Sequence, residues 1–154
     1  MKYAVILLSC IWAAGCATTY KQPTTVAPDT SQRIVGNPQA LLRAAKQVLV
    51  SEGFQITSAD ETAGVVSTAP RDIRLTPELA DCGTTLGLDY LKDNRTSSKL
   101  GYGVLVSENK VTLKASMSAT YLPGNDSQSI TLTCVSRGVL EGQLLDKIAA
   151  AAKK

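Results

Sequence analysis

The chain has 154 residues, of which 44% are hydrophobic and 19% charged, and it is long enough for one domain with a buried core. Its 16 Lys and Arg against 13 Asp and Glu give a formal net charge of +3, a balance that gives no support for nucleic-acid binding. Histidine is absent, which excludes Ser–His and Cys–His nucleophilic sites and histidine-bearing zinc sites.

The first residues have the pattern of an export signal. Lys2 supplies a positive charge, and residues 4–14 form an almost unbroken apolar stretch. About eleven apolar residues suit a signal peptide, but they are too few to cross a bilayer, which needs roughly 20. The stretch ends at Ala13-Ala14-Gly15-Cys16, where small side chains flank the expected cleavage point.

These four residues resemble the lipobox of bacterial lipoproteins, with Ala13 where that family most often has Leu. The resemblance implies that residues 1–15 are a signal peptide and that Cys16 carries fatty acyl chains such as palmitate. Two or three such chains hold a protein stably to a membrane. Because Ala17 and not Asp follows the cysteine, the enterobacterial sorting rule favours the outer membrane, with the domain facing the periplasm. Two alternatives stay open: an ordinary secretory signal that leaves Cys16 as a plain thiol, or a buried core helix.

Residues 16–32 are predicted to form a lipidated, flexible tether. Thr, Pro, Ser, Gln and Ala dominate the segment, and Pro23 and Pro28 interrupt regular structure. As a random coil it would reach on the order of 20 Å from the membrane. Residues 33–154 are predicted to form a single periplasmic domain.

The domain is predicted to begin with a short strand at residues 33–35 and a helix. Asn37 has the position of an N-cap, Pro38 that of the first helical residue, and Gly53 that of the C-cap. Between them, apolar residues recur at helical spacing and form one stripe, namely Leu41, Ala44, Ala45, Val48 and Leu49. A hairpin follows, with strands near residues 54–57 and 65–69.

Residues 71–98 lack regular periodicity and are predicted to be irregular, with a helical turn at residues 76–80. Three strands follow, in which alternate residues share one face. The inward sets are predicted to be Leu100, Tyr102, Val104 and Val106; then Val111, Leu113, Ala115, Met117, Ala119 and Tyr121; then Ile130, Leu132 and Cys134. Residues 107–110 match an S-x-x-K pattern, but their position between two strands favours a hairpin turn.

The last element is predicted to be a helix capped by Ser136. Its apolar stripe is predicted to consist of Val139, Leu140, Leu144, Ile148 and Ala151. Apolar and polar side chains alternate along each strand, so one face of the sheet is apolar. The two amphipathic helices can cover that face. The sequence therefore predicts an α+β fold, a two-layer sandwich of an antiparallel sheet with both helices on one face.

One part of the domain resembles a known family. A helix ending in Glu52-Gly53-Phe54, an acidic turn and Gly64-Val65-Val66 are similar to the helix-plus-hairpin unit of BamC-type envelope lipoproteins. Members of that group have helix-grip-like domains and accompany the machinery that inserts outer-membrane barrels. The resemblance spans residues 38–71, under a third of the mature chain.

Two cysteines remain in the predicted domain, Cys82 and Cys134. In an oxidising periplasm such a pair is expected to form a disulfide, and the inward parity of Cys134 fits a buried bond. The alternative is a metal or redox pair, against which the wide spacing and the absence of a C-x-x-C motif both speak.

The candidate contact surface is basic and consists of Arg71, Arg74, Lys92, Arg95 and Lys99. It would meet anionic headgroups or a partner protein, and the alternative is a loop whose charges are simply solvated. No cofactor, metal or nucleic acid is expected. The leading hypothesis is a non-enzymatic, membrane-tethered accessory lipoprotein of an envelope assembly, for outer-membrane biogenesis, secretion or conjugation. The alternative is a periplasmic module that binds lipid or glycan, and an enzyme is the third hypothesis.

Overall fold

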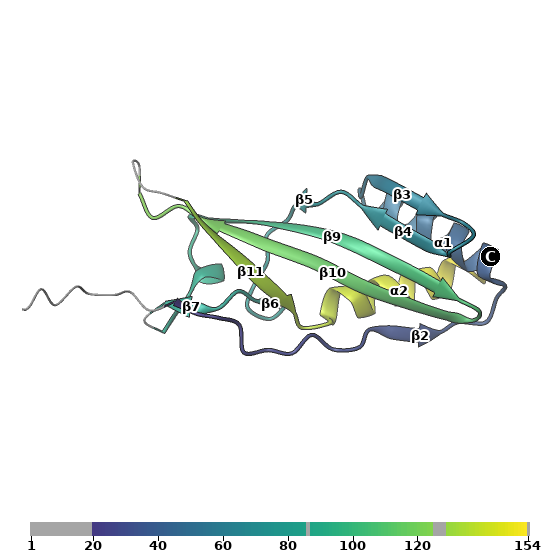
Figure 1. The fold of residues 1–154 in the computed structure, drawn as a ribbon, viewed down its shortest axis with the longest axis horizontal. Helices are drawn as coiled ribbons and strands as arrows, with labels where there is room; N and C mark the ends of the chain where they lie inside the picture. Colours follow the sequence, from purple (N-terminus) through teal and green to yellow (C-terminus); the bar gives the residue numbers. More distant parts are fainter. Residues whose placement is uncertain (1–19, 86, 125–128, 154) are drawn as a thin grey trace, which may run out of the picture.

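The computed structural model describes residues 20–85, 87–124 and 129–153, so the predicted signal peptide and Cys16 lie outside the described residues. Figure 1 shows an elongated molecule built on a long sheet. Its elements are, in chain order, β1 (Tyr20–Lys21), β2 (Ser31–Arg33), α1 (Pro38–Ser51), β3 (Ile56–Asp60), β4 (Val65–Thr68), β5 (Arg71–Asp72), β6 (Ala80–Asp81), β7 (Thr84–Thr85), β8 (Leu88–Asp89), the 3₁₀ turn η1 (Tyr90–Lys92), β9 (Thr96–Ser107), β10 (Lys110–Tyr121), β11 (Ile130–Ser136) and α2 (Val139–Ala151).

The main sheet is antiparallel. Within the described residues its strand order is β3-β4-β9-β10-β11-β6, while β5 pairs with β9 and β2 pairs with β10. The β9–β10 hairpin is its long axis and runs from the pair Ser107–Lys110 at the turn to the pair Thr96–Tyr121 at the open end. β2 and β11 share the other edge of β10. A small sheet, β1-β7-β8, lies at the open end of the hairpin (Figure 1).

The predicted strand alternation is confirmed in the core. On β9 and β10 the side chains expected to face inward are buried or half-buried, from Leu100 to Val106 and from Val111 to Tyr121. On β11, Leu132 and Cys134 are buried as predicted. Ile130 differs, because it begins the strand at the rim of the sheet and is 41% exposed.

Helix α1 is confirmed, except that its C-cap is Glu52 and not Gly53. The Asn37 side chain accepts a hydrogen bond from the Ala40 amide at 2.7 Å, and Pro38 is the first helical residue. Gly53 follows the helix with φ +81°, a conformation that costs glycine little. The predicted apolar stripe is the buried face. Local capping and periodicity therefore determined this element.

Helix α2 begins at Val139, and its core-facing side includes four residues of the predicted stripe, namely Leu140, Leu144, Ile148 and Ala151, but not Val139. The buried residues are Glu141, Leu144, Leu145 and Ile148, whereas Val139 is 42% exposed. Helical spacing places those four residues on one face. The Glu141 carboxylate is buried on this face because it accepts a hydrogen bond from the Ser136 hydroxyl at 2.7 Å. Ser136 is therefore not the N-cap; that residue is Gly138.

The two helices contact each other. α1 also contacts β3, β4 and β9, and α2 contacts β10. Their buried side chains and the inward side chains of the strands form one hydrophobic core. The structure is thus an antiparallel, sheet-dominated α+β fold with two helices, as the sequence predicts.

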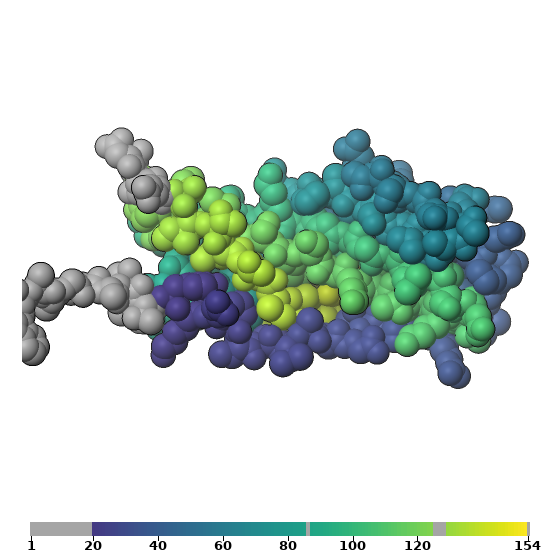
Figure 2. All heavy atoms as spheres, in the orientation of Figure 1, coloured from purple at the N-terminus to yellow at the C-terminus, as the bar shows by residue number. Residues whose placement is uncertain are grey.

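The prediction of a flexible tether is wrong for the residues from Tyr20 onward. Residues 20–33, here called the strap, run along the domain as an extended segment, seen as the purple-to-blue band in Figure 2. β1 pairs with β7, and β2 pairs with the start of β10. Proline prevents helix but tolerates an extended chain at a sheet edge, so Pro23 and Pro28 do not oppose this docking. Residues 20–32 therefore pack against the domain that was predicted to begin at Arg33, and the predicted strand at residues 33–35 lies instead at Ser31–Arg33.

Two glycines make room for the strap. A Cβ atom on Gly83 would lie 2.3 Å from the Lys21 carbonyl oxygen, and one on Gly138 would lie 2.5 Å from Cγ of Pro28. Both glycines also have positive φ, +77° and +81°. The domain surface is thus shaped at both positions for close approach of the N-terminal segment.

Candidate functional site

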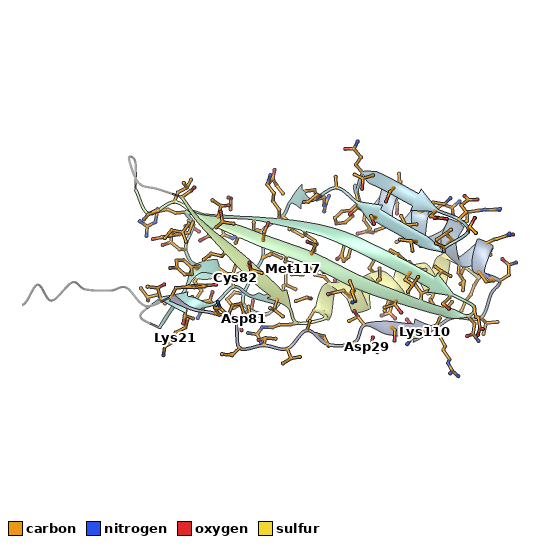
Figure 3. The ribbon with its side chains drawn as sticks, viewed as in Figure 1. Lys21, Asp29, Asp81, Cys82, Lys110 and Met117 are labelled. Carbon is orange, nitrogen blue, oxygen red and sulfur yellow. A yellow bond between two sulfur atoms is a disulfide. The ribbon has the colours of Figure 1, made fainter. Side chains whose placement is uncertain are left out.

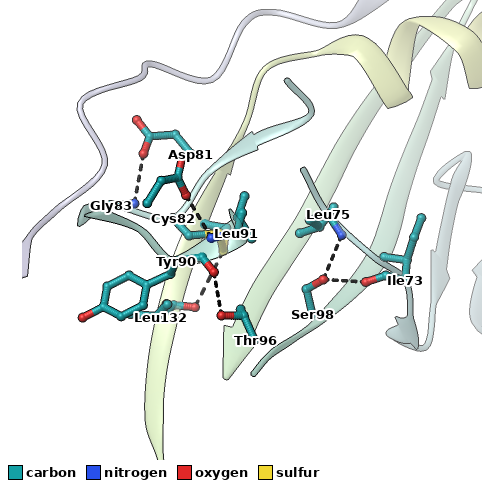
Figure 4. Close-up of a disulfide and its surroundings, with 12 residues drawn as sticks. Ile73, Leu75, Asp81, Cys82, Gly83, Tyr90, Leu91, Thr96, Ser98 and Leu132 are labelled. Carbon is teal, nitrogen blue, oxygen red and sulfur yellow. Dashed lines mark hydrogen bonds between the residues drawn. A yellow bond between two sulfur atoms is a disulfide. The ribbon is translucent and has the colours of Figure 1, made fainter. Parts of the chain in front are cut away.

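The predicted disulfide is present. A bond joins Cys82 to Cys134, 52 residues apart, and both residues are buried. Cys82 lies in the irregular segment, which is ordered by short strands and by the predicted turn, where Leu79 and Ala80 donate to the Thr76 carbonyl. In the chain-entropy model a loop of this length stabilises the fold by about 4 kcal/mol. The disulfide therefore holds the irregular segment against β11 (Figure 4).

The strap meets the disulfide region at its first described residue. The Tyr20 hydroxyl donates to the Cys82 carbonyl oxygen at 2.9 Å. Next to it, one oxygen of Asp81 accepts from the Thr24 and Thr25 amides and the Thr25 hydroxyl, and the other accepts from the Gly83 amide. Burial opposes ionisation of Asp81, but these hydrogen bonds outweigh it and lower the pKa of its carboxyl. An ionised Asp81 thus binds the strap to the domain.

Three tyrosines form a cluster at the same end of the molecule. The ring centroids of Tyr20 and Tyr90 are 6.2 Å apart, and those of Tyr90 and Tyr121 are 5.0 Å apart. The hydroxyl of Tyr90 contacts that of Thr85. Tyr121 is predicted to face inward on its strand, but Tyr20 was not predicted to take part because it lies in the expected tether. Its one available signal is an aromatic side chain inside a Thr- and Pro-rich segment.

Apolar side chains around this cluster are open to solvent. Leu88 is 74% exposed, Leu122 49%, Ile130 41% and Tyr20 38%. With the tyrosine cluster they make up what we call the tyrosine end, a term that covers Tyr20, Leu88, Tyr90, Tyr121, Leu122 and Ile130. A cavity of about 190 Å³ lies within it, lined in part by Leu88, Tyr90, Tyr121 and Arg95.

An ion pair borders the tyrosine end. Nη2 of Arg95 lies 2.6 Å from Oδ2 of Asp93, and its guanidinium lies 5.1 Å from the centre of the Tyr121 ring. Hydrogen bonds from the Arg95 side chain and amide, with smaller contributions from its charge and from Tyr121, lower the pKa of Asp93 to about 2. The same pair raises the pKa of Arg95. Both groups are therefore charged at neutral pH.

Four of the five basic residues of the predicted contact surface have separate local partners. Lys92 is exposed at the end of η1, close in sequence to the Arg95–Asp93 pair. Arg74 donates to the Asn94 side chain at 2.8 Å. Nζ of Lys99 lies 3.9 Å from Asp72, and the Arg71 guanidinium lies 4.6 Å from the centre of the Phe54 ring. Lys92 and Arg95 thus belong to the tyrosine-end region, whereas Arg71 and Lys99 lie along β5 and β9. Their role as one contact surface stays a prediction.

A groove lies between the strap and the sheet edge. It occupies about 490 Å³ between residues 27–30 of the strap, residues 113–115 of β10, residues 134–136 of β11 and Glu141. Burial raises the pKa of the Tyr102 hydroxyl above its ordinary value, and the negative charge of the Glu141 carboxylate makes a smaller contribution in the same direction. Glu141 was not among the predicted core or site residues, although its helical spacing from Leu144, Leu145 and Ile148 places it on the same face.

The S-x-x-K segment is a hairpin turn, as predicted. Ser107 ends β9 and pairs with Lys110, which begins β10. Glu108 has φ +53° and the Asn109 carbonyl accepts from the Ile34 amide, so the segment serves as a turn and a strap contact.

In residues 20–85, 87–124 and 129–153, no group of three or more Cys, Asp or Glu side chains is placed to hold a metal ion. Over that same part of the chain, no helix has both the length and the apolar character needed to traverse a bilayer.

Comparison with known proteins gives a structural neighbour and no family. No family model matches the chain, and no curated protein matches it. Among solved structures, the chain is similar to a crystal structure of a TBP-like protein from Parabacteroides distasonis, with 13% identity and a TM-score of 0.48. The match covers 80% of this chain and 90% of that one.

Proposed function

We propose that this chain is a lipid-anchored accessory protein of a bacterial envelope assembly, cleaved before Cys16, acylated on that cysteine and exposed in the periplasm. It acts without catalysis, as an interaction domain for outer-membrane biogenesis, secretion or conjugation. The short apolar segment at residues 4–14 and the Ala13-Ala14-Gly15-Cys16 motif support the anchor. The absence of Asp at position 17 supports the outer membrane.

The observation that carries the proposal is the buried bond between Cys82 and Cys134. Structural disulfides form and persist in oxidising compartments, such as the bacterial periplasm. A domain that depends on one is expected to be exported, and the chain has the features of an export signal immediately ahead of it.

The same proposal includes the layer arrangement of the domain, with α1 and α2 on one face of the sheet as a two-layer sandwich. Contact between the helices, and contact of both with the sheet strands, supports this arrangement. It would leave the opposite face of the sheet, which carries the outward side chains of β9 and β10, open to a partner in the periplasm.

The test of the anchor is expression of the full chain in a bacterium that processes lipoproteins. The wild-type protein should sediment with membranes and lack residues 1–15 by mass spectrometry, and Cys16→Ser should be released. Cys10→Ser is the matched control, because Cys10 lies in the apolar signal and should leave localisation unchanged. Continued membrane attachment of Cys16→Ser, or an unmodified thiol at Cys16 in the wild type, would refute the anchor. Crosslinking of the anchored wild type, followed by mass spectrometry, then identifies the partner.

A ligand-binding module is the second candidate, and the groove under the strap favours it. Its volume of about 490 Å³ lies within the range of small-molecule sites, roughly 300–1,000 Å³. If the groove binds lipid or glycan, a lysophospholipid or a soluble muropeptide should raise the melting temperature of the mature chain. At a ligand concentration about 100-fold above Kd the gain would be about 2.7 kcal/mol. An unchanged melting curve with both compounds would eliminate this candidate.

A further inference from the structure

We propose that the tyrosine end is a membrane-contact surface, which packs against the headgroup layer of the bilayer that holds the Cys16 lipid. This inference rests on the proposed anchor and extends it by assigning the orientation of the domain. Its occupant is the lipid surface itself, and a protein partner at this end is an outcome that the test below distinguishes.

The length of chain outside the described residues sets how far this end can move from the membrane. Only residues 17–19 separate Cys16 from Tyr20. Four fully extended steps span at most about 14 Å. The headgroup layer on one side of a bilayer is roughly 5–8 Å thick, so Tyr20 is held within or just above it.

The strap does not lengthen this connection. Tyr20 and Lys21 pair with Thr85 and Thr84, and the Tyr20 hydroxyl is bonded to Cys82. Asp81 holds Thr24 and Thr25 a few residues later. Any lifting of this end from the bilayer by more than the reach of residues 17–19 would require these bonds to break. The anchor therefore brings the tyrosine end close to the lipid.

The side chains at this end suit a lipid interface. Leu88, Leu122 and Ile130 are exposed apolar residues, and tyrosine is enriched where membrane meets water because its ring is apolar and its hydroxyl polar. Lys21 and Lys92 are exposed, as is common for lysines whose stems lie at an interface.

Among the described residues at this end, positive and negative side chains are equal in number, and this balance decides the type of membrane contact. Lys21, Lys92 and Arg95 are matched by Asp81, Asp89 and Asp93. Attraction to anionic lipid therefore contributes little to the free energy of membrane contact, and burial of apolar side chains contributes most of it. Contact should persist in zwitterionic vesicles and from about 0.1 M to about 1 M salt, where the Debye length falls from about 10 Å to about 3 Å.

The far end of the molecule should then stand away from the membrane. Figure 3 shows Lys110, at the β9–β10 turn, at the opposite end of the molecule from Lys21. Val35 lies beside this turn, because the preceding Ile34 amide donates to the Asn109 carbonyl, and Val35 is 95% exposed. It is therefore the matched control position for a reporter.

The test uses tryptophan as a depth reporter. Trp12 is the single tryptophan of the sequence and lies in the segment removed with the signal, so the mature chain has none. Acylated Leu88→Trp, Leu122→Trp and Val35→Trp chains, purified from bacterial membranes, are reconstituted into phosphatidylcholine vesicles with and without brominated acyl chains. Flotation first measures whether each chain is anchored.

The expected result is flotation of all three chains, with quenching by brominated lipid about twofold stronger at positions 88 and 122 than at Val35, since interfacial side chains lie roughly 5–10 Å into the headgroup boundary. Floating chains with equal quenching at all three positions, or with none, would overturn the inference and leave the anchor intact. Failure to float would refute the anchor and the inference together. Shielding of Leu88→Trp in native membranes but not in vesicles would overturn it in favour of a protein partner.

Discussion

The Tyr20 hydroxyl donates a hydrogen bond to the carbonyl oxygen of Cys82, 62 residues further along the chain. This bond joins the first described residue to the disulfide that holds the irregular segment on β11. The N-terminal strap is consequently part of the folded domain, and the proposed lipid anchor, Cys16, lies four residues before Tyr20.

Asp81→Ala is predicted to release the strap. The substitution removes the acceptor of four hydrogen bonds, three of them from Thr24 and Thr25. The free energy of unfolding should fall by about 1–3 kcal/mol, and amide exchange at Thr24 and Thr25 should accelerate. Asp29→Ala, at an exposed position in the same strap, is the control and should change neither. Unchanged exchange in Asp81→Ala would show that the strap is held by other contacts.

Gly83→Ala and Gly87→Ala form a matched pair. Both glycines have positive φ, +77° and +78°, so both substitutions carry the same backbone penalty, about 1–2 kcal/mol. Only at Gly83 would the new methyl group collide with the Lys21 carbonyl, whereas Gly87 has open space. We expect Gly83→Ala to destabilise the domain by a further 1–3 kcal/mol or so, measured by chemical denaturation. Equal effects would contradict the docked position of β1.

The Asp93–Arg95 pair makes a pH-dependent contribution to stability. Because the folded pKa of Asp93, about 2, lies below the ordinary 3.8, the contribution is present above pH 3.8 and is lost as pH falls toward 2. Carboxyl carbon chemical shifts should titrate with a midpoint near 2 in the wild type. In Arg95→Gln the midpoint should rise toward 3.8, while Lys92→Gln should leave it near 2. A wild-type midpoint near 3.8 would exclude the pair.

Leu144→Asp and Val139→Asp distinguish the observed face of α2 from the predicted one. Leu144 is 4% exposed, so an aspartate there places an unpaired charge in the core and should cost about 4 kcal/mol or more. Val139 is 42% exposed, and its replacement should cost less than about 1 kcal/mol. Thermal unfolding followed by circular dichroism measures both. Similar losses for the two variants would mean that the helix faces the core as the sequence pattern predicted.

Much of the fold was predictable from local signals. Asn37, Pro38 and Gly53 mark the ends of α1, because caps depend on backbone groups within one helical turn. The inward sets of β9 and β10 follow from a side-chain period of two, which needs no knowledge of the partner strand. The Cys82–Cys134 pairing was predictable because the proposed signal removal and acylation of Cys16 would leave no other cysteines.

The sequence by itself therefore determined the strand faces, the first helix and the disulfide, since each depends on short-range periodicity or on a unique pair. Only the tertiary structure decided that the strap docks, that Glu141 is buried and that Tyr20, Tyr90 and Tyr121 meet. The physical reason is that an extended Thr- and Pro-rich segment has no period of its own. Whether it stays in water or pairs depends on free sheet edges, which exist only after distant strands have assembled.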